Sequence, residues 1–71
     1  MSEFGNLVRE IRGNRSLREF AALVGVTYES IRNWEDGRHV PSPESFFALR
    51  RQATPSQRER LEKLIVGNGR N

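Results

Sequence analysis

The sequence predicts an all-α domain built from five helices. Apolar residues recur three and four positions apart, which is the spacing of one helical face, and serines, threonines and glycines bound each such stretch. No stretch has the strict alternation typical of a β-strand. The length of 71 residues suits one small domain and argues against a deep substrate cleft. We expect a single domain over residues 1–66 and a flexible tail over 67–71.

Each predicted helix begins at a side chain that can accept hydrogen bonds from the free N–H groups of the first turn. The predicted N-caps are Ser2, Ser16, Thr27, Ser42 and Thr54. Glu19 and Gln57 each follow a cap by three residues and complete a capping box. Pro43 and Pro55 suit the first helical position.

Glycines predict where the first three helices end, namely Gly13, Gly25 and Gly37. The fourth helix is expected to end near Ala53 and the fifth near Val66. The helices should therefore cover about residues 3–12, 17–24, 28–36, 43–53 and 55–66.

The apolar positions of these helices define the expected core. The core prediction comprises Phe4, Leu7, Ile11, Phe20, Leu23, Ile31, Trp34 and Leu49. Phe46 and Phe47 should supply further apolar contacts from the fourth helix. Leu61, Leu64, Ile65 and Val66 form the stripe of the fifth. That stripe either packs internally or meets a second copy of the chain.

Only Val26 and Thr27 separate Gly25 from the third helix, so the second and third helices must cross steeply. This is the geometry of a helix-turn-helix. The small side chain of Ala21 permits close approach, and Val26 and Ile31 form an apolar wedge between the two helices. The opposite face of the third helix is left polar.

Charge and composition restrict the function. The net charge is +3, and all the excess lies in residues 44–71. Arginine supplies 11 of the 12 basic residues, which suits phosphate or guanine contacts but can equally reflect codon usage. The chain has no cysteine, one histidine, no membrane-spanning run and no signal peptide, so we expect a cytoplasmic protein. We expect no catalytic site, metal, cofactor, membrane or small-molecule ligand.

The stretch RSLREFAALVGVTYESIRNWEDGRHVP, residues 15–41, resembles the Cro/C1-type helix-turn-helix proteins of phage repressors and their bacterial relatives. The resemblance rests on Ser16, Ala21, the Gly25-Val26-Thr27 turn, Ile31, the Trp34-Glu35 pair, Gly37 and Pro41. With the flanking helices it extends over about residues 3–65. It implies a compact lambda-repressor-like domain whose third helix enters the major groove of DNA.

By position, the resemblance implies that Tyr28, Glu29, Arg32 and Asn33 read bases. Asparagine pairs with adenine, glutamate accepts from the cytosine amino group, and arginine takes guanine or a phosphate. Tyrosine offers its ring to a thymine methyl and its hydroxyl to the DNA backbone. The implied phosphate contacts are Ser16, Arg18, Thr27 and Arg38. The alternative for the outer face of this helix is an ordinary solvated surface. His39 should be a loop residue that lies near the DNA backbone or is simply exposed to solvent.

Two positions depart from the family pattern. Leu17 stands where most relatives have a DNA-contacting glutamine. The connection after the first helix is about two residues shorter than usual, which places Arg12 at the position of the family's structural arginine. We therefore expect an ion pair between Arg12 and Glu35 that fixes the fold.

These expectations combine into a nucleoid-associated transcriptional regulator, a Cro/C1-like repressor that binds double-stranded operator DNA as a homodimer. Paired half-sites would lie about 34 Å apart. The arginines of the last two helices, Arg50, Arg51, Arg58 and Arg60, would flank the groove or the dimer edge. Two alternatives stay open: an antitoxin or protein-interaction module, and an accessory DNA-binding factor for recombination or transfer.

Overall fold

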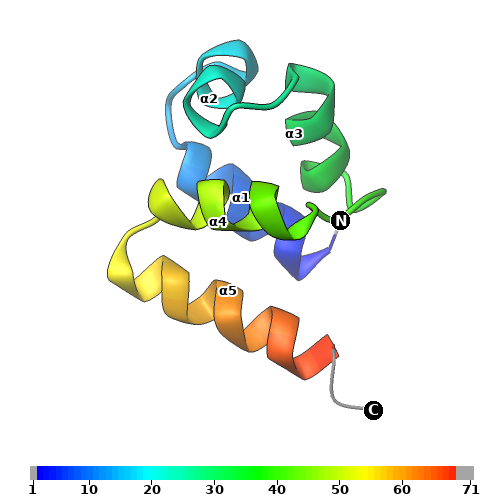
Figure 1. Cartoon of the computed structure of the whole chain (residues 1–71), viewed down its shortest axis with the longest axis vertical. Coiled ribbons are helices and arrows are strands. Elements are labelled where there is room, and N and C mark those ends of the chain that lie inside the picture. Colours follow the sequence, from blue (N-terminus) through cyan, green and yellow to red (C-terminus); the bar gives the residue numbers. More distant parts are fainter. Residues whose placement is uncertain (1, 69–71) are drawn as a thin grey trace.

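The computed structural model describes residues 2–68, with side chains as far as Leu64, and contains five helices (Figure 1). They are α1 (Glu3–Arg12), α2 (Leu17–Val24), α3 (Tyr28–Glu35), α4 (Pro43–Arg51) and α5 (Pro55–Asn68). Residues 2–68 include no strand, so the predicted all-α fold is confirmed. Helix α5 continues two residues into the predicted tail, and residues 69–71 lie outside the described part.

The predicted helix starts are confirmed. Hydroxyl groups accept hydrogen bonds from backbone N–H groups at the starts of all five helices, from Ser2, Ser16, Thr27, Ser42 and Thr54. Glu19 closes a capping box on Ser16, and Gln57 closes another because its Oε1 accepts from the Thr54 N–H at 2.9 Å. The predicted glycines after α1, α2 and α3 all have positive φ.

Helix α1 lies between the other elements. It contacts α3 on one side and α5 on another, while α2 contacts both α3 and α4. Figure 1 shows α2 and α3 at one end of the molecule, α5 at the other, and α1 and α4 between them. The buried core consists of Phe4, Leu7, Val8, Ile11, Phe20, Ala21, Val24, Ile31, Trp34, Leu49, Ala53 and Leu61. Every helix contributes to this single core.

Two apolar predictions are wrong. Leu23, which the sequence predicts in the core, is 50% exposed, and Phe47 is 60% exposed. At about 100° per residue, Phe20, Ala21 and Val24 share one inward arc of α2, and Leu23 falls beside it. On α4 the buried side is set by Leu49, with Phe46 half-buried, so that the neighbouring Phe47 turns outward.

Gly5 permits a close approach that the apolar pattern did not reveal. It is buried within α1 against the end of α3. A methyl group at this position would overlap the Glu35 carbonyl oxygen and lie 3.0 Å from that of Trp34. Both obstacles are backbone atoms, so no side-chain rotation relieves the overlap. Glycine is required here because of packing rather than backbone conformation.

Polar contacts hold α5 against its neighbours. The Glu10 carboxylate accepts from Arg60 Nη1 at 2.8 Å and from Gln57 Nε2 at 3.1 Å. Arg50 on α4 pairs with Glu62 at 2.7 Å. Two arginines expected at the groove or dimer edge therefore make internal ion pairs. None of the described helices is both long and apolar enough to cross a membrane.

Candidate DNA-binding surface

The turn between α2 and α3 fixes how α3 is presented. Gly25 adopts the left-handed conformation with φ 87° and ψ 32°, which is strained for any residue with a side chain. Its N–H donates to the Ala21 carbonyl at 2.7 Å, and the Val26 N–H donates to the same oxygen at 3.0 Å. Thr27 then starts α3 at once. The chain thus reverses within three residues, as a helix-turn-helix requires.

Helix α3 has two chemically distinct faces. Ile31 and Trp34 are buried in the core, at 0% and 4% exposure. Glu29 and Arg32 are exposed on the opposite side, and Asn33 is partly exposed next to them. The apolar face fixes the rotation of the helix about its axis. Consequently the polar face has a defined direction, away from the core.

A polar hollow of about 420 Å³ lies along this outer face. Its lining residues are Glu29, Arg32, Asn33, Asp36 and Arg38. Three of the four predicted base-reading residues and one predicted phosphate contact therefore lie together. Two carboxylates and two guanidinium groups share the hollow, so it offers both donors and acceptors to a partner.

Tyr28, the fourth predicted base-reading residue, is placed differently. It is half-buried and packs against the edge of the core. The guanidinium carbon of Arg18 lies 4.7 Å from the centre of its ring, in a cation–π contact between α2 and α3. One ring face is thereby covered. This contact also holds the exposed Arg18 side chain beside the start of α3.

Ser16 and Thr27 lie at the N-termini of α2 and α3. Ser16 Oγ accepts from the Glu19 N–H at 3.0 Å, and Thr27 Oγ1 accepts from the Ser30 N–H at 3.2 Å. Both side chains are exposed, and the Ser16 hydroxyl keeps a proton to donate. Thr27 Oγ1 also lies 3.0 Å from Ser30 Oγ, in a hydrogen bond that either hydroxyl can donate. The side chain of Leu17 is partly buried against the core instead of facing outward. Its replacement of the family's usual glutamine therefore serves packing.

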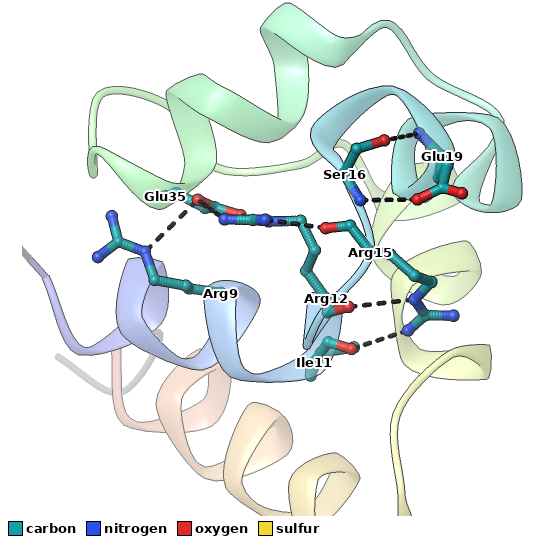
Figure 2. A network of polar contacts seen from close by, with 7 residues as sticks. All are labelled: Arg9, Ile11, Arg12, Arg15, Ser16, Glu19 and Glu35. Carbon is teal, nitrogen blue, oxygen red and sulfur yellow. Dashed lines mark hydrogen bonds and ion pairs between the residues drawn. The ribbon is translucent and has the colours of Figure 1, made fainter.

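The predicted pair between Arg12 and Glu35 is confirmed (Figure 2). Arg12 Nε donates to Glu35 Oε2 at 2.7 Å, and Nη2 donates to Oε1 at 3.2 Å. The hydrogen-bonded carboxylate raises the pKa of Arg12 above its ordinary value. Arg9 adds a longer contact to the same carboxylate, at 3.6 Å. Because Glu35 ends α3, the pair locks this helix to the end of α1.

Arg15 is a structural residue that the sequence pattern does not predict. Its Nε donates to the Arg12 carbonyl at 3.1 Å and its Nη2 to the Ile11 carbonyl at 2.9 Å, which satisfies the C-terminal end of α1 (Figure 2). Arg12 Nη1 donates in return to the Arg15 carbonyl at 2.9 Å. The Arg15 guanidinium also lies 5.1 Å from the Phe20 ring centre. A basic residue just after a helix is the only sequence signal for this role.

Comparison with known proteins agrees with this geometry. A family model described as helix-turn-helix matches residues 7–52, which include α2, the turn and α3. No curated protein and no solved structure shows significant similarity to the chain. The fold and the match define a helix-turn-helix protein of the DNA-binding regulator class. The chain belongs to the Cro/C1-type helix-turn-helix family.

Proposed function

We propose that this protein is a sequence-specific regulator of transcription that reads operator DNA with the outer face of α3. The observation that carries the proposal is the division of α3 into a buried apolar face and an exposed polar face, held in direction by the Arg12–Glu35 pair. A recognition helix needs such a fixed direction because base edges are read by hydrogen bonds of defined geometry.

The base-reading roles follow from the functional groups in the hollow. Arg32 donates two parallel hydrogen bonds to guanine, and Asn33 pairs with adenine through its amide. Glu29 accepts from a cytosine amino group and repels sites that present only phosphate or acceptor atoms to it. Tyr28 acts through its hydroxyl and free ring edge, because Arg18 covers one ring face.

Phosphate contacts surround these base contacts in the proposal. Arg18 is held by Tyr28 beside the α3 N-terminus, and Arg38 projects from the loop after α3 at the edge of the hollow. The exposed hydroxyl groups of Ser16 and Thr27, with the positive ends of the α2 and α3 dipoles, complete a backbone-binding surface. Such contacts release counterions, so affinity should fall steeply as salt rises.

The regulator acts as a repressor in this proposal, by occupying a promoter as Cro-like proteins do. It binds as a homodimer to paired half-sites in the DNA of the nucleoid. Two copies related by a twofold axis match two half-sites related by the same symmetry. Its control then depends on its concentration and turnover.

Selection of bound sequences from random DNA duplexes tests the proposal. The wild-type protein should enrich one motif made of two half-sites. Arg32→Ala and Asn33→Ala should each relax one position of that motif, with a loss of about 1–3 kcal/mol for the preferred base. Glu59→Ala, an exposed change on α5, is the matched control and should leave the motif unchanged. The proposal would be overturned if wild type selected no motif, or if both α3 variants selected the same motif as wild type.

A further inference from the structure

An apolar patch lies exposed immediately after α3. Val40 is 69% exposed and Phe47 is 60% exposed, although both are large apolar residues. Together with Pro41, Pro43 and Phe46 they line a hollow of about 280 Å³. The rings of Phe46 and Phe47 pack edge to face with their centres 6.1 Å apart, and this packing fixes the shape of the patch. These exposed apolar residues, gathered in one place, form a candidate interaction surface.

The charges on α4 indicate what covers it. Glu44, Phe47 and Arg51 lie within one narrow arc of the helix, because they are three, four and seven positions apart. Glu44 and Arg51 are exposed, and neither makes an ion pair within residues 2–64. At about 1.5 Å per residue they stand roughly 10 Å apart, one on each side of Phe47. The order along the exposed face is therefore acid, aromatic ring, base.

The exposed face of α4 is complementary to the same face of a second copy that runs in the opposite direction. If a second α4 packs antiparallel against the first, each Glu44 faces the Arg51 of the other copy, and the two Phe47 rings meet near the twofold axis. The midpoint between positions 44 and 51 falls within half a residue of Phe47, so one axis satisfies all three contacts. We propose that a second copy of this chain covers the patch through such an antiparallel α4 contact.

The location suits the proposed function, on which this inference rests. The patch begins at Val40, four residues after Asp36 at the end of α3. A twofold axis at Phe47 would therefore set the spacing and direction of two α3 helices. This interface differs from the α5 stripe expected from the sequence. Of that stripe, Leu61 is fully buried in the domain's own core and Leu64 packs against that core, whereas the side chains of Ile65 and Val66 lie outside the described part.

The contact should be weak without DNA. Stable dimers usually bury about 800 Å² per partner, and a patch of five apolar side chains with two exposed ion pairs supplies less. Binding to adjacent half-sites raises the effective concentration of one copy near the other. The dimer should therefore be detectable in concentrated protein and should be much more stable on a duplex with two half-sites.

Charge reversal tests the antiparallel arrangement directly. Glu44→Arg alone and Arg51→Glu alone should each raise the dimer dissociation constant about tenfold or more, because two attractive contacts become repulsive. The double variant Glu44→Arg/Arg51→Glu should dimerise like wild type. An equimolar mixture of the two single variants should form mixed dimers more tightly than either variant dimerises alone. Sedimentation equilibrium measures the dimer dissociation constant of the two single variants, the double variant and the mixture. Circular dichroism checks that their helix content is unchanged.

A cysteine cross-link provides a second measurement, since the natural chain has no cysteine. Under oxidation Phe47→Cys should form a disulfide-linked dimer, because its position lies at the axis. Leu23→Cys, at a similarly exposed leucine on α2, is the matched control and should remain monomeric. Wild-type protein that stays monomeric at the highest soluble concentration, charge variants that dimerise like wild type, or equal cross-linking of both cysteine variants would overturn the inference.

The two proposals fail separately. If wild type selects a DNA motif with a single half-site and never dimerises, the α4 interface is wrong and the DNA-reading function stands. If the charge variants behave as expected but no duplex binds at low salt, the interface stands and the proposed function is wrong.

Discussion

Arg12 and Glu35, 23 positions apart in the chain, are joined by two hydrogen bonds of 2.7 Å and 3.2 Å between guanidinium and carboxylate. The Glu35 side chain is only 6% exposed, whereas that of Arg12 is 20% exposed. A carboxylate so deeply buried needs a partner, because removing a charge from water without compensation is costly. This pair therefore sets the orientation of α3 and, with it, the direction of the proposed DNA-reading face.

Arg12→Ala should lower the free energy of unfolding by about 2–4 kcal/mol, because it leaves a buried carboxylate with only the longer contact to Arg9. Glu35→Ala should cost less, since Arg12 can hydrate and keep its bond to the Arg15 carbonyl. Urea unfolding of both single variants and the double variant measures their coupling. Arg9→Ala, whose half-exposed side chain lies farther from the carboxylate, is the control. Strictly additive losses would show that the pair contributes nothing.

Gly5→Ala should destabilise the protein by about 2–4 kcal/mol, although alanine favours a helix over glycine by about 1 kcal/mol. The added methyl group overlaps backbone atoms of Glu35, so α1 and α3 must move apart. Thermal unfolding measures the loss. Asn6→Ala changes the adjacent exposed position of the same helix and should be neutral or slightly stabilising. An increase in stability for Gly5→Ala would refute the close approach.

The α1–α5 contact should become less stable in acid, because Glu10 is then protonated. Hydrogen bonds from Gln57 and then Arg60 lower the pKa of Glu10 below its ordinary value of 4.5. A carboxylate whose pKa is lower in the folded state stabilises the fold fully at a pH above its unfolded-state pKa. This contribution disappears as the pH falls through its folded-state pKa. Thermal melts of wild type and Glu10→Gln should therefore differ most above pH 4.5 and converge as the pH falls through the lowered pKa of Glu10. A difference that persists at the acidic end would contradict the assignment.

The contact between Arg18 and Tyr28 should contribute to DNA affinity without reading sequence. Arg18→Ala should lower the affinity for all duplexes by a similar factor. It should also reduce the slope of log affinity against log salt concentration by about 1, as the loss of one phosphate contact predicts. Tyr28→Phe keeps the ring under the guanidinium and should preserve that slope, whereas Tyr28→Ala should reduce it. Fluorescence anisotropy at several salt concentrations measures the slopes. If Arg18→Ala changes base preference instead, the assignment to phosphate is wrong.

Much of the fold follows from local sequence signals. Hydroxyl caps and terminal glycines predict helix boundaries because they act on neighbouring backbone groups, and the bounds of α1 agree with those expected. Only the family resemblance predicts the Arg12–Glu35 pair, since no local signal joins residues so far apart. The apolar pattern misplaces Leu23 and Phe47, because a spacing of three or four residues does not define which side of a short helix is covered.

Other features depend on tertiary contacts. Nothing around Gly5 in the sequence reveals that the backbone of α3 passes against it. The stacking of Arg18 on Tyr28 likewise depends on the crossing of α2 and α3. Of the candidate site, the grouping of Glu29, Arg32 and Asn33 on one face could be predicted from helical periodicity alone. Their common hollow with Arg38 could not, because it depends on the path of the loop after Gly37.

Amide chemical shifts of isotope-labelled protein, followed while the duplex recovered by selection is added, test the direction of α3 most directly. We predict large shifts over residues 27–33 and at Arg18 and Arg38, with little change over the exposed side of α5. Shifts confined to α4 and α5, with residues 28–33 unmoved at saturating duplex, would show that another surface binds DNA and that the outer face of α3 does not read it.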